Sequence, residues 1–211
     1  MTKSRAANSS RRTRIQREKE ERILKAALET FSKHGFRGST LDQIADAAGM
    51  SKPNVLYYFR NKEAMHKALL DQLLDTWLDP LRDMNPEGDP LSEILKYVTR
   101  KLDMSRQQAQ ESRLFANEIL QGARGIRNTL KGPLKALVDE KTALIQTWMD
   151  AGRLARCDPY HLIFSIWATT QHYADFESQV GVVLGKGRKD TTFEDAATFL
   201  THLYTSSLKP A

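Results

Sequence analysis

The chain has 211 residues, of which 40% are hydrophobic and 27% are charged, and its formal net charge is +6 at pH 7. It contains no run of about 18 apolar residues and its basic N-terminus has no apolar signal segment, so neither a membrane span nor a secretory leader is expected. The single cysteine cannot form an internal disulfide, which is typical of a reducing cytoplasm, and no zinc-spaced Cys/His cluster or glycine-rich phosphate loop is present.

Positive charge is concentrated towards the N-terminus. Residues 1–17 hold six basic and no acidic residues, and residues 1–70 hold fifteen basic and seven acidic residues. The other 141 residues hold seventeen basic and nineteen acidic residues. This distribution indicates that the N-terminal third meets a polyanion. Residues 1–15 are expected to form a disordered basic arm that can reach DNA phosphates or the minor groove, the alternative being a solvated tail that only aids solubility.

The first three predicted helices follow one another closely. Apolar periodicity predicts a helix from about Arg14 to His34 that Gly35 ends. Thr40-x-x-Gln43 is a capping-box pattern at the start of a second, short helix. The turn at 49–51 then leads into a third helix, with Ser51 as the expected N-cap. Two short helices joined by a glycine-bearing turn indicate a helix-turn-helix motif over about residues 40–59, within a domain of residues 16–62.

The third helix carries polar side chains suited to DNA. In a helix-turn-helix the second helix of the motif enters the major groove. We expect Lys52, Asn54 and Tyr58 to face outward, while Val55 and Phe59 point to the core. Lysine supplies a charge for phosphates or guanine, asparagine pairs with adenine, and tyrosine hydroxyls suit phosphate oxygens. The alternative is an ordinary helical hairpin with a solvated polar face.

Residues 40–65, TLDQIADAAGMSKPNVLYYFRNKEAM, closely resemble the DNA-binding segment of the TetR family of bacterial repressors, and the similarity extends over residues 18 to about 75. The resemblance implies that Thr40 and Lys62 hold phosphates. The family usually has tyrosine where this chain has Leu56, so that phosphate contact is expected from Tyr57 instead. The predicted DNA-binding residues are Thr40, Ser51, Lys52, Pro53, Asn54, Tyr57, Tyr58 and Lys62.

Residues 63–211 are expected to form a helical ligand-binding and dimerisation domain, which makes the whole chain all-α. A long helix begins near residue 62 and is expected to break or kink at Pro80. A loop covers 84–90, and helical patterns follow at 91–107, 111–121, 126–153, 159–178 and 192–208. Residues 180–190 are expected to form a mobile connector.

The helix at 159–178 carries a pair of side chains that suits a flat heterocycle. Trp167 and Gln171 are one turn apart, so they share a face. An indole offers an apolar surface, and an amide offers one donor and one acceptor side by side, which complements the N–H and C=O of a lactam or imide such as uracil. The alternative is a core tryptophan beside a glutamine that bonds backbone or water.

The segments WLDPL (77–81), RLFANEIL (113–120), GPLKALVDEKTALI (132–145) and IWATTQHYADF (166–176) resemble the C-terminal domain of pyrimidine-utilisation repressors within the TetR family. The resemblance implies a uracil- or thymine-sensing pocket between the long helix and the later bundle. The candidate ligand-binding residues are Leu74, Trp77, Leu78, Phe115, Trp167 and Gln171. Weaker candidates are Tyr97, Arg100, Glu118 and His172, of which Arg100 or Glu118 could equally form a buried ion pair.

The sequence therefore predicts a cytoplasmic homodimeric regulator, expected to be a repressor of pyrimidine or nitrogen catabolism genes. It would bind near-palindromic double-stranded DNA and respond to uracil or thymine, with no cofactor, metal or catalysis. Two alternatives stay open: another effector, such as a purine or dihydropyrimidine catabolite, or a DNA-binding protein without a small-molecule effector. An enzyme is disfavoured because Cys157 has no base at recognisable spacing, although adjacent Arg156 is expected to favour its thiolate modestly.

Overall fold

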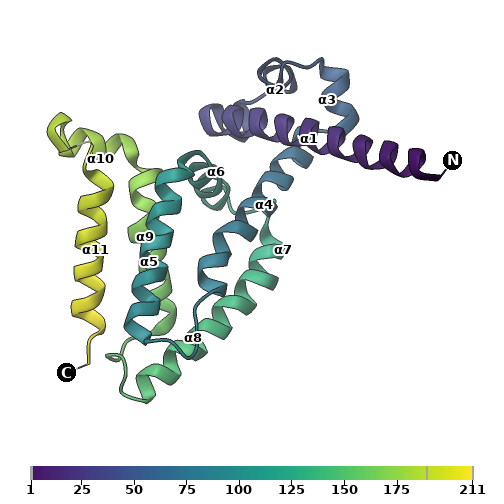
Figure 1. Cartoon of the computed structure of the whole chain (residues 1–211). Coiled ribbons are helices and arrows are strands. Elements are labelled where there is room, and N and C mark those ends of the chain that lie inside the picture. Colours follow the sequence, from purple (N-terminus) through teal and green to yellow (C-terminus); the bar gives the residue numbers. More distant parts are fainter. Residues whose placement is uncertain (1, 189, 211) are drawn as a thin grey trace. The chain divides into compact units, whose positions relative to one another are not determined.

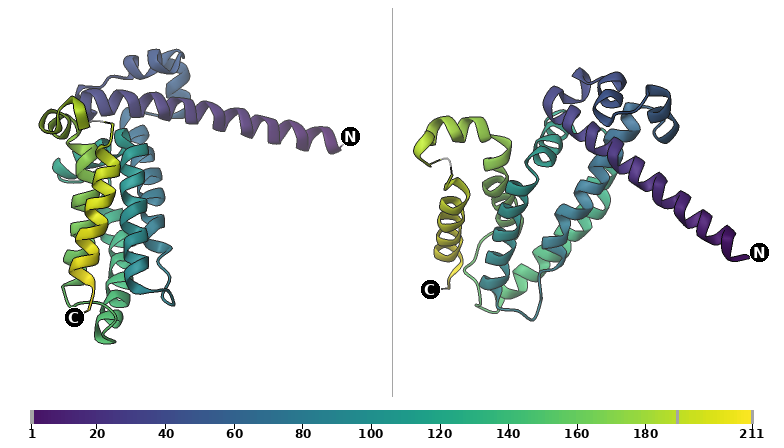
Figure 2. Two further views of the ribbon diagram at one scale, coloured as in Figure 1. Left: turned by 60° about the vertical axis from the view of Figure 1, so that its left-hand side comes forward. Right: turned by 45° about the horizontal axis from the view of Figure 1, so that its top comes forward.

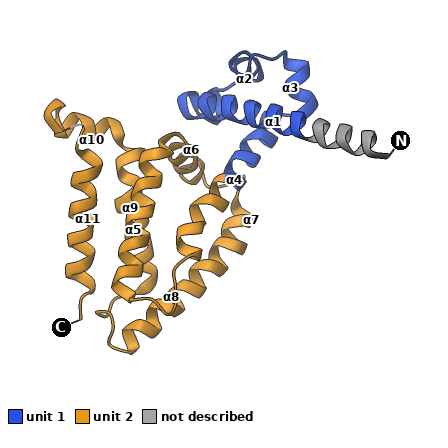
Figure 3. Cartoon of the chain, viewed as in Figure 1, with its two compact units in different colours: residues 1–72 blue, residues 73–211 orange. Residues whose placement is uncertain are grey.

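The computed structural model describes residues 14–188 and 190–210, and the described residues form helices and connecting turns without a β-strand. The predicted basic arm, residues 1–15, lies almost wholly outside them. The chain divides into two units, residues 1–72 and 73–211 (Figure 3). The division falls inside one helix, α4 (Lys62–Arg82), ten residues after the predicted boundary between residues 62 and 63.

The first unit packs α1 (Thr2–Gly38), α2 (Leu41–Ala48) and α3 (Lys52–Tyr58) with the first part of α4. The stripe predicted on the first helix forms its core, because Ile23, Ala27 and Phe31 are all buried. Gly35 has φ 68° and ψ 167°, so the regular helix ends where the glycine predicted it. On either side of Gly35, the rings of Phe31 and Phe36 both contact the ring of His66, at centroid distances of 5.2 and 4.7 Å.

The second unit contains the rest of α4 and the remaining helices. In chain order these are α5 (Pro90–Gln107), α6 (Ala109–Leu120), α7 (Arg127–Thr129), η1 (Leu130–Leu134), α8 (Lys135–Asp150), α9 (Pro159–Asp175), α10 (Glu177–Leu184), η2 (Lys186–Arg188) and α11 (Thr192–Leu208). The helix α5 is central, since α6, α9 and α11 all pack against it (Figures 1 and 2). The apolar stripes of α5, α8, α9 and α11 meet in one core that includes Ile94, Ile145, Ile163 and Leu200.

Three local predictions differ in part from the structure. The helix α4 continues through Pro80 to Arg82, because a proline in the last turn removes only one hydrogen bond and buried Leu81 anchors the segment. The expected connector at 180–190 is helical in its first part, as α10. The single helix expected over 126–153 is interrupted by the π-helical turn η1, which contains Pro133. No helix among the described residues is both long enough and apolar enough to span a bilayer.

Candidate nucleic-acid interface and ligand site

The turn between α2 and α3 is built around Gly49. Its φ of 60° lies in the left-handed region that favours glycine, and the next amide, of Met50, donates to the Ala45 carbonyl at 2.9 Å. Arg22 on α1 supports this turn from outside: its Nε donates to the Ala48 carbonyl at 2.6 Å and its Nη2 to the Gly49 carbonyl at 3.1 Å. A Cβ at Gly49 would lie 2.6 Å from that Nη2. A larger residue here would therefore be strained by the backbone conformation and would displace the Arg22 guanidinium.

The capping box at the start of α2 is present as predicted. The Gln43 amide donates to Thr40 Oγ1 at 3.2 Å, and the Thr40 amide donates to Gln43 Oε1 at 2.9 Å. The Thr40 side chain is exposed, and its hydroxyl hydrogen is left for an outside acceptor. At the start of α3, in contrast, the expected N-cap Ser51 makes no side-chain capping bond. Its exposed hydroxyl is thus also available.

The face of α3 that meets solvent differs slightly from the predicted one. Val55 is fully buried, as expected, whereas Phe59 is only half-buried. Tyr57 is 73% exposed, while Tyr58 and Asn54 are half-buried. Tyr57 is therefore the most available aromatic hydroxyl of the motif. The Tyr57 ring leans edge-on against Tyr58, with centroids 5.1 Å apart.

The two lysines of the motif both have partners inside the protein. Lys52 Nζ lies 2.9 Å from the Asp42 carboxylate, so this exposed pair links α3 to α2. Lys62 Nζ donates to the carbonyls of Phe36 and Ser39 at 2.7 and 2.8 Å and lies over the Phe36 ring. Lys62 thus ties the loop before α2 to the start of α4, and one of its three N–H groups is left for a phosphate. Pro53 is exposed in the first turn of α3.

In the second unit, the predicted ligand residues Trp77 and Phe115 meet. Their rings lie 6.3 Å apart, and Trp77 Nε1 donates to Gln108 Oε1 at 2.7 Å. Leu74 and Leu78, on the same helix as Trp77, are buried beside it. A small apolar wall is therefore formed from α4 and α6, with the indole N–H already satisfied.

The other predicted pair lies on α9. Trp167 Nε1 donates to the hydroxyl of Tyr97 on α5 at 2.6 Å. Burial raises the pKa of the Tyr97 hydroxyl, although this hydrogen bond opposes the shift. Gln171 follows one turn later, is half-buried, and makes no side-chain hydrogen bond to any described residue. Its amide is therefore open to a ligand or to water.

The helix α5 joins these two groups through a residue that sequence reasoning missed, Lys101. Its Nζ lies 4.1 Å from the centroid of the Trp77 ring, and the side chain is buried. Burial lowers the pKa of this ammonium to about 7, and the attraction of Asp175 offsets only part of that effect. Asp175 accepts a hydrogen bond from Ser112 Oγ at 2.5 Å. Burial raises the pKa of the Asp175 carboxyl despite this bond.

The weaker candidates lie elsewhere. Arg100 forms a 2.7 Å ion pair with Asp83 that is exposed rather than buried. Glu118 accepts a hydrogen bond from the Gly125 amide at 2.7 Å, and His172 is exposed and stacks on Phe176. Cys157 is exposed at a helix boundary. The expected thiolate preference is wrong, because desolvation and then Asp158 raise the pKa of the Cys157 thiol.

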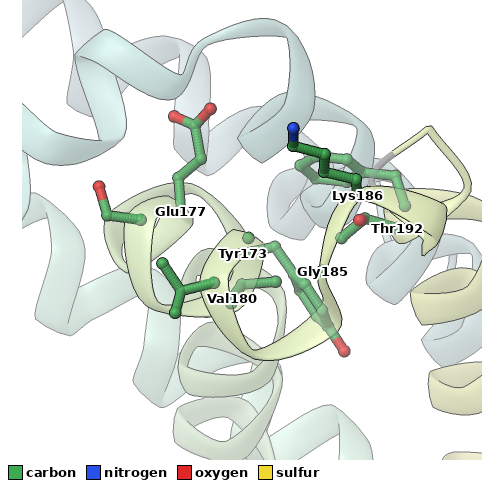
Figure 4. A pocket seen from close by; sticks show the side chains of 10 residues that line it. Tyr173, Glu177, Val180, Gly185, Lys186 and Thr192 are labelled. Atoms are coloured by element: carbon green, nitrogen blue, oxygen red, sulfur yellow. The ribbon is translucent and has the colours of Figure 1, made fainter.

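Two surface hollows are present in the second unit. One, of about 600 Å³, lies at the junction of α9, α10 and α11 and is lined by Tyr173, Lys186 and Phe193 among others (Figure 4). The other, of about 360 Å³, is bordered by Arg113 and Asp175. None of the predicted ligand residues lines either of these two hollows. Within the described residues, no group of His, Cys, Asp or Glu side chains is arranged to hold a metal ion.

A helix-turn-helix unit followed by an all-helical second unit defines a class of bacterial transcriptional regulator. Residues 23–69 match the family described as "Bacterial regulatory proteins, tetR family", and residues 70–211 match "YcdC-like protein, C-terminal region". Together the two matches cover most of the sequence. The chain belongs to the TetR family.

Among curated relatives, the chain is 50% identical to the HTH-type transcriptional regulator RutR of Escherichia coli K12 over 193 residues, which covers 92% of this chain and 91% of the relative. This likeness confirms the expected resemblance to the pyrimidine-utilisation regulators. Among solved structures, AibR in complex with isovaleryl coenzyme A and operator DNA has a TM-score of 0.68 at 18% identity, covering 88% of this chain and 97% of AibR. A TetR-like regulator from Rhodococcus sp. RHA1 has a TM-score of 0.65 at 17% identity, covering 88% and 93%. Both structures share the fold.

Proposed function

We propose that this regulator controls pyrimidine or nitrogen catabolism genes by binding a near-palindromic operator as a homodimer, and that a small planar imide such as uracil or thymine alters its operator affinity. The 50% identity to RutR supports the gene class. The observation that carries the effector assignment is Gln171, a half-buried amide without a protein partner, one turn from Trp167. As a DNA-binding regulator it would act in the bacterial cytoplasm.

The DNA contact is assigned to α3 and the residues around it. Tyr57 and Ser51 offer exposed hydroxyls, Thr40 offers a hydroxyl at the start of α2, and Asn54 is the candidate for reading a base. We expect four further residues to position α3 and to contact the DNA backbone: Lys52, Pro53, Tyr58 and Lys62. A selection from a random-sequence DNA pool tests this assignment, and it should return two half-sites about one helical turn or a multiple apart.

The homodimer is assigned to the outer faces of α9 and α11. These faces expose aromatic side chains that a solitary chain would leave in water: Phe164 is 46% exposed and Phe199 is 59% exposed. Two copies pairing these helices would form a four-helix bundle and bury that surface. Light scattering on purified protein should give twice the mass of the chain. Phe199→Glu should halve that mass, and a wild-type monomer would refute the dimer.

Effector recognition follows from hydrogen-bond complementarity. The Gln171 amide can donate to a ring carbonyl and accept from the adjacent ring N–H of an imide, while Trp77 and Trp167 supply apolar walls. Cytosine has an unprotonated N3 in place of the imide N–H and an amino group in place of the C4 carbonyl, so in the same orientation the Gln171 amide would set acceptor against acceptor and donor against donor. Uracil and thymine should therefore bind, and cytosine should not.

The effector acts only by binding two conformations of the dimer unequally. Trp77 lies on α4, and residues 62–72 of the same helix belong to the first unit. We propose that closing Trp77 onto the ligand moves α4 and thereby changes the fit of the dimer to its operator. Whether this releases DNA or strengthens binding is read directly from the operator affinity with and without ligand.

Calorimetric titration with uracil, thymine, dihydrouracil and cytosine tests the effector assignment. Gln171→Leu should weaken the affinity for uracil by about 10-fold or more. Gln110→Leu, on the exposed side of α6, is the matched control and should bind as the wild type does. Binding of dihydrouracil alone would favour the non-planar catabolite, and no binding by any of the four would favour a regulator without this effector. Operator affinity at fixed salt, measured by anisotropy on the selected site, completes the test.

A further inference from the structure

Lys101 occupies an unusual place on α5. It belongs to the apolar stripe of that helix, with Tyr97 one turn before it and Val98 and Leu102 beside it, and only 3% of its surface is exposed. None of the described residues accepts a hydrogen bond from its Nζ, which lies over the Trp77 ring. By contrast, the buried Lys141 has a carboxylate partner 3.0 Å away, in Glu140. Lys101 is thus a buried ammonium without a hydrogen-bond acceptor.

The nearby charges do not supply that acceptor. Asp175 on α9 attracts Lys101, but its carboxylate takes a hydrogen bond from Ser112 instead. Arg113 on α6 adds a second positive charge near the same carboxylate. A methionine of similar length would fill the position without the desolvation of a charge. Packing alone therefore does not account for a lysine here.

Space remains next to the ammonium. Within the described residues, no side-chain nitrogen or oxygen is both sealed from solvent and without a partner. Since Lys101 Nζ has no partner, it must retain contact with space that a water-sized probe reaches. A ligand oxygen of similar size can therefore approach it. The ring of Trp77 fixes the direction of that approach, because it covers one side of the ammonium.

Helical spacing places Gln171 towards the same space. On α5, Tyr97 and Lys101 are one turn apart, and on α9, Trp167, Gln171 and Asp175 follow at four-residue steps. Tyr97 bonds Trp167, and Lys101 is attracted by Asp175, so the two helices face each other along these stripes. Gln171 lies between the two points of contact. An open amide and an unpartnered ammonium thus face one region beside Trp77.

We propose that Lys101 is a specificity-determining residue of the effector site, whose Nζ donates a hydrogen bond to a ring carbonyl oxygen of a planar lactam or imide that Gln171 holds by its polar edge. This inference rests on the proposed effector class. It adds a requirement that Gln171 alone does not impose, since one carbonyl oxygen of the ring must face an N–H group of Lys101. Rings without an oxygen at that position are rejected.

Calorimetry with wild type, Lys101→Met and the matched control Lys96→Met tests the inference. Lys96 is exposed on the same helix, so its loss should leave affinity unchanged. The ligands are uracil, pyrimidin-2-one and pyrimidin-4-one, of which the last two each lack one carbonyl oxygen. Lys101→Met should bind uracil about 10- to 100-fold more weakly. One of the two analogues should bind poorly to the wild type, and that discrimination should disappear in Lys101→Met.

The outcomes separate cleanly. If Lys101→Met binds uracil as the wild type does, the inference is overturned while the proposed effector stands. If it binds weakly but still discriminates between the analogues as the wild type does, Lys101 is only structural and the inference is again overturned. If the wild type binds no imide, the proposed effector fails and the inference fails with it. Lys101→Gln, a neutral donor, should recover part of the affinity and discrimination, which covers the case in which the methionine variant does not fold.

Discussion

Replacing Lys101 by methionine should stabilise the unliganded protein at neutral pH. Burial lowers the pKa of this lysine from 10.5 to about 7. Between those two values the unfolded chain binds the proton and the folded chain does not, so the free energy of unfolding rises with pH in this window. At about 1.4 kcal/mol per pKa unit, the lysine destabilises the fold by roughly 4 kcal/mol at pH 7 and by roughly 2 kcal/mol at pH 9. The lost contact with Trp77 offsets about 1 kcal/mol of the gain from its removal.

Urea titrations of wild type and Lys101→Met at pH 7, 8 and 9 measure this difference. The variant should be more stable by about 3 kcal/mol at pH 7, and the advantage should shrink by about 2 kcal/mol at pH 9. The raised pKa of the Tyr97 hydroxyl lies above this window, so Tyr97 does not contribute to the difference. Parallel pH profiles for the two proteins would show that Lys101 keeps its proton when folded, and the reasoning from burial would be refuted.

Three further changes test the first unit and the cysteine. Lys62→Ala removes two hydrogen bonds to loop carbonyls, so it should lower the free energy of unfolding by about 1–3 kcal/mol. It should also weaken DNA binding at every sequence. An unchanged melting temperature would contradict the structural role of Lys62. In Gly49→Ala the new methyl group meets both a backbone with positive φ and the Arg22 guanidinium, so operator affinity measured by anisotropy should fall about 10-fold or more. Adding Arg22→Ala to the same chain should recover only the part of that loss caused by the clash. Cys157→Ser should leave DNA binding intact, and the wild-type thiol should react with a maleimide faster as the pH rises through the region above its ordinary pKa.

The features that the sequence predicted best depend on short stretches of chain. The Thr40–Gln43 capping box and the left-handed Gly49 involve residues three or four apart, so their pattern is visible in the sequence alone. The buried stripe of Ile23, Ala27 and Phe31 follows from helical periodicity in the same way. The meeting of Trp77 with Phe115 depended instead on the resemblance to known regulators, since no local pattern brings α4 to α6.

The features that could not be predicted from the sequence depend on contacts between distant segments. The signal for Lys101 was present, as one charged residue inside the apolar stripe from Ile94 to Ser105, but a lysine in that position usually reaches solvent by its long stem. Only the packing of α4, α6 and α9 around α5 shows that the side chain of Lys101 stays buried. The partners of Lys62 are likewise more than twenty residues away. The helix α10 was missed because its glycine, Gly181, and its mostly apolar sequence resemble a connector.

The helix α4 has Lys62 in its first turn, tied to the loop before the DNA-binding motif, and Trp77 fifteen residues later, beside the candidate effector site. In a regular α-helix each residue adds about 1.5 Å of length and about 100° of rotation about the axis. Adding or removing a single residue between Lys62 and Trp77 would change the length by little and the rotation by more than a quarter of a turn. The regulator should therefore tolerate substitutions on the exposed side of this segment far better than insertions of one residue, which put the sensing end and the reading end out of phase.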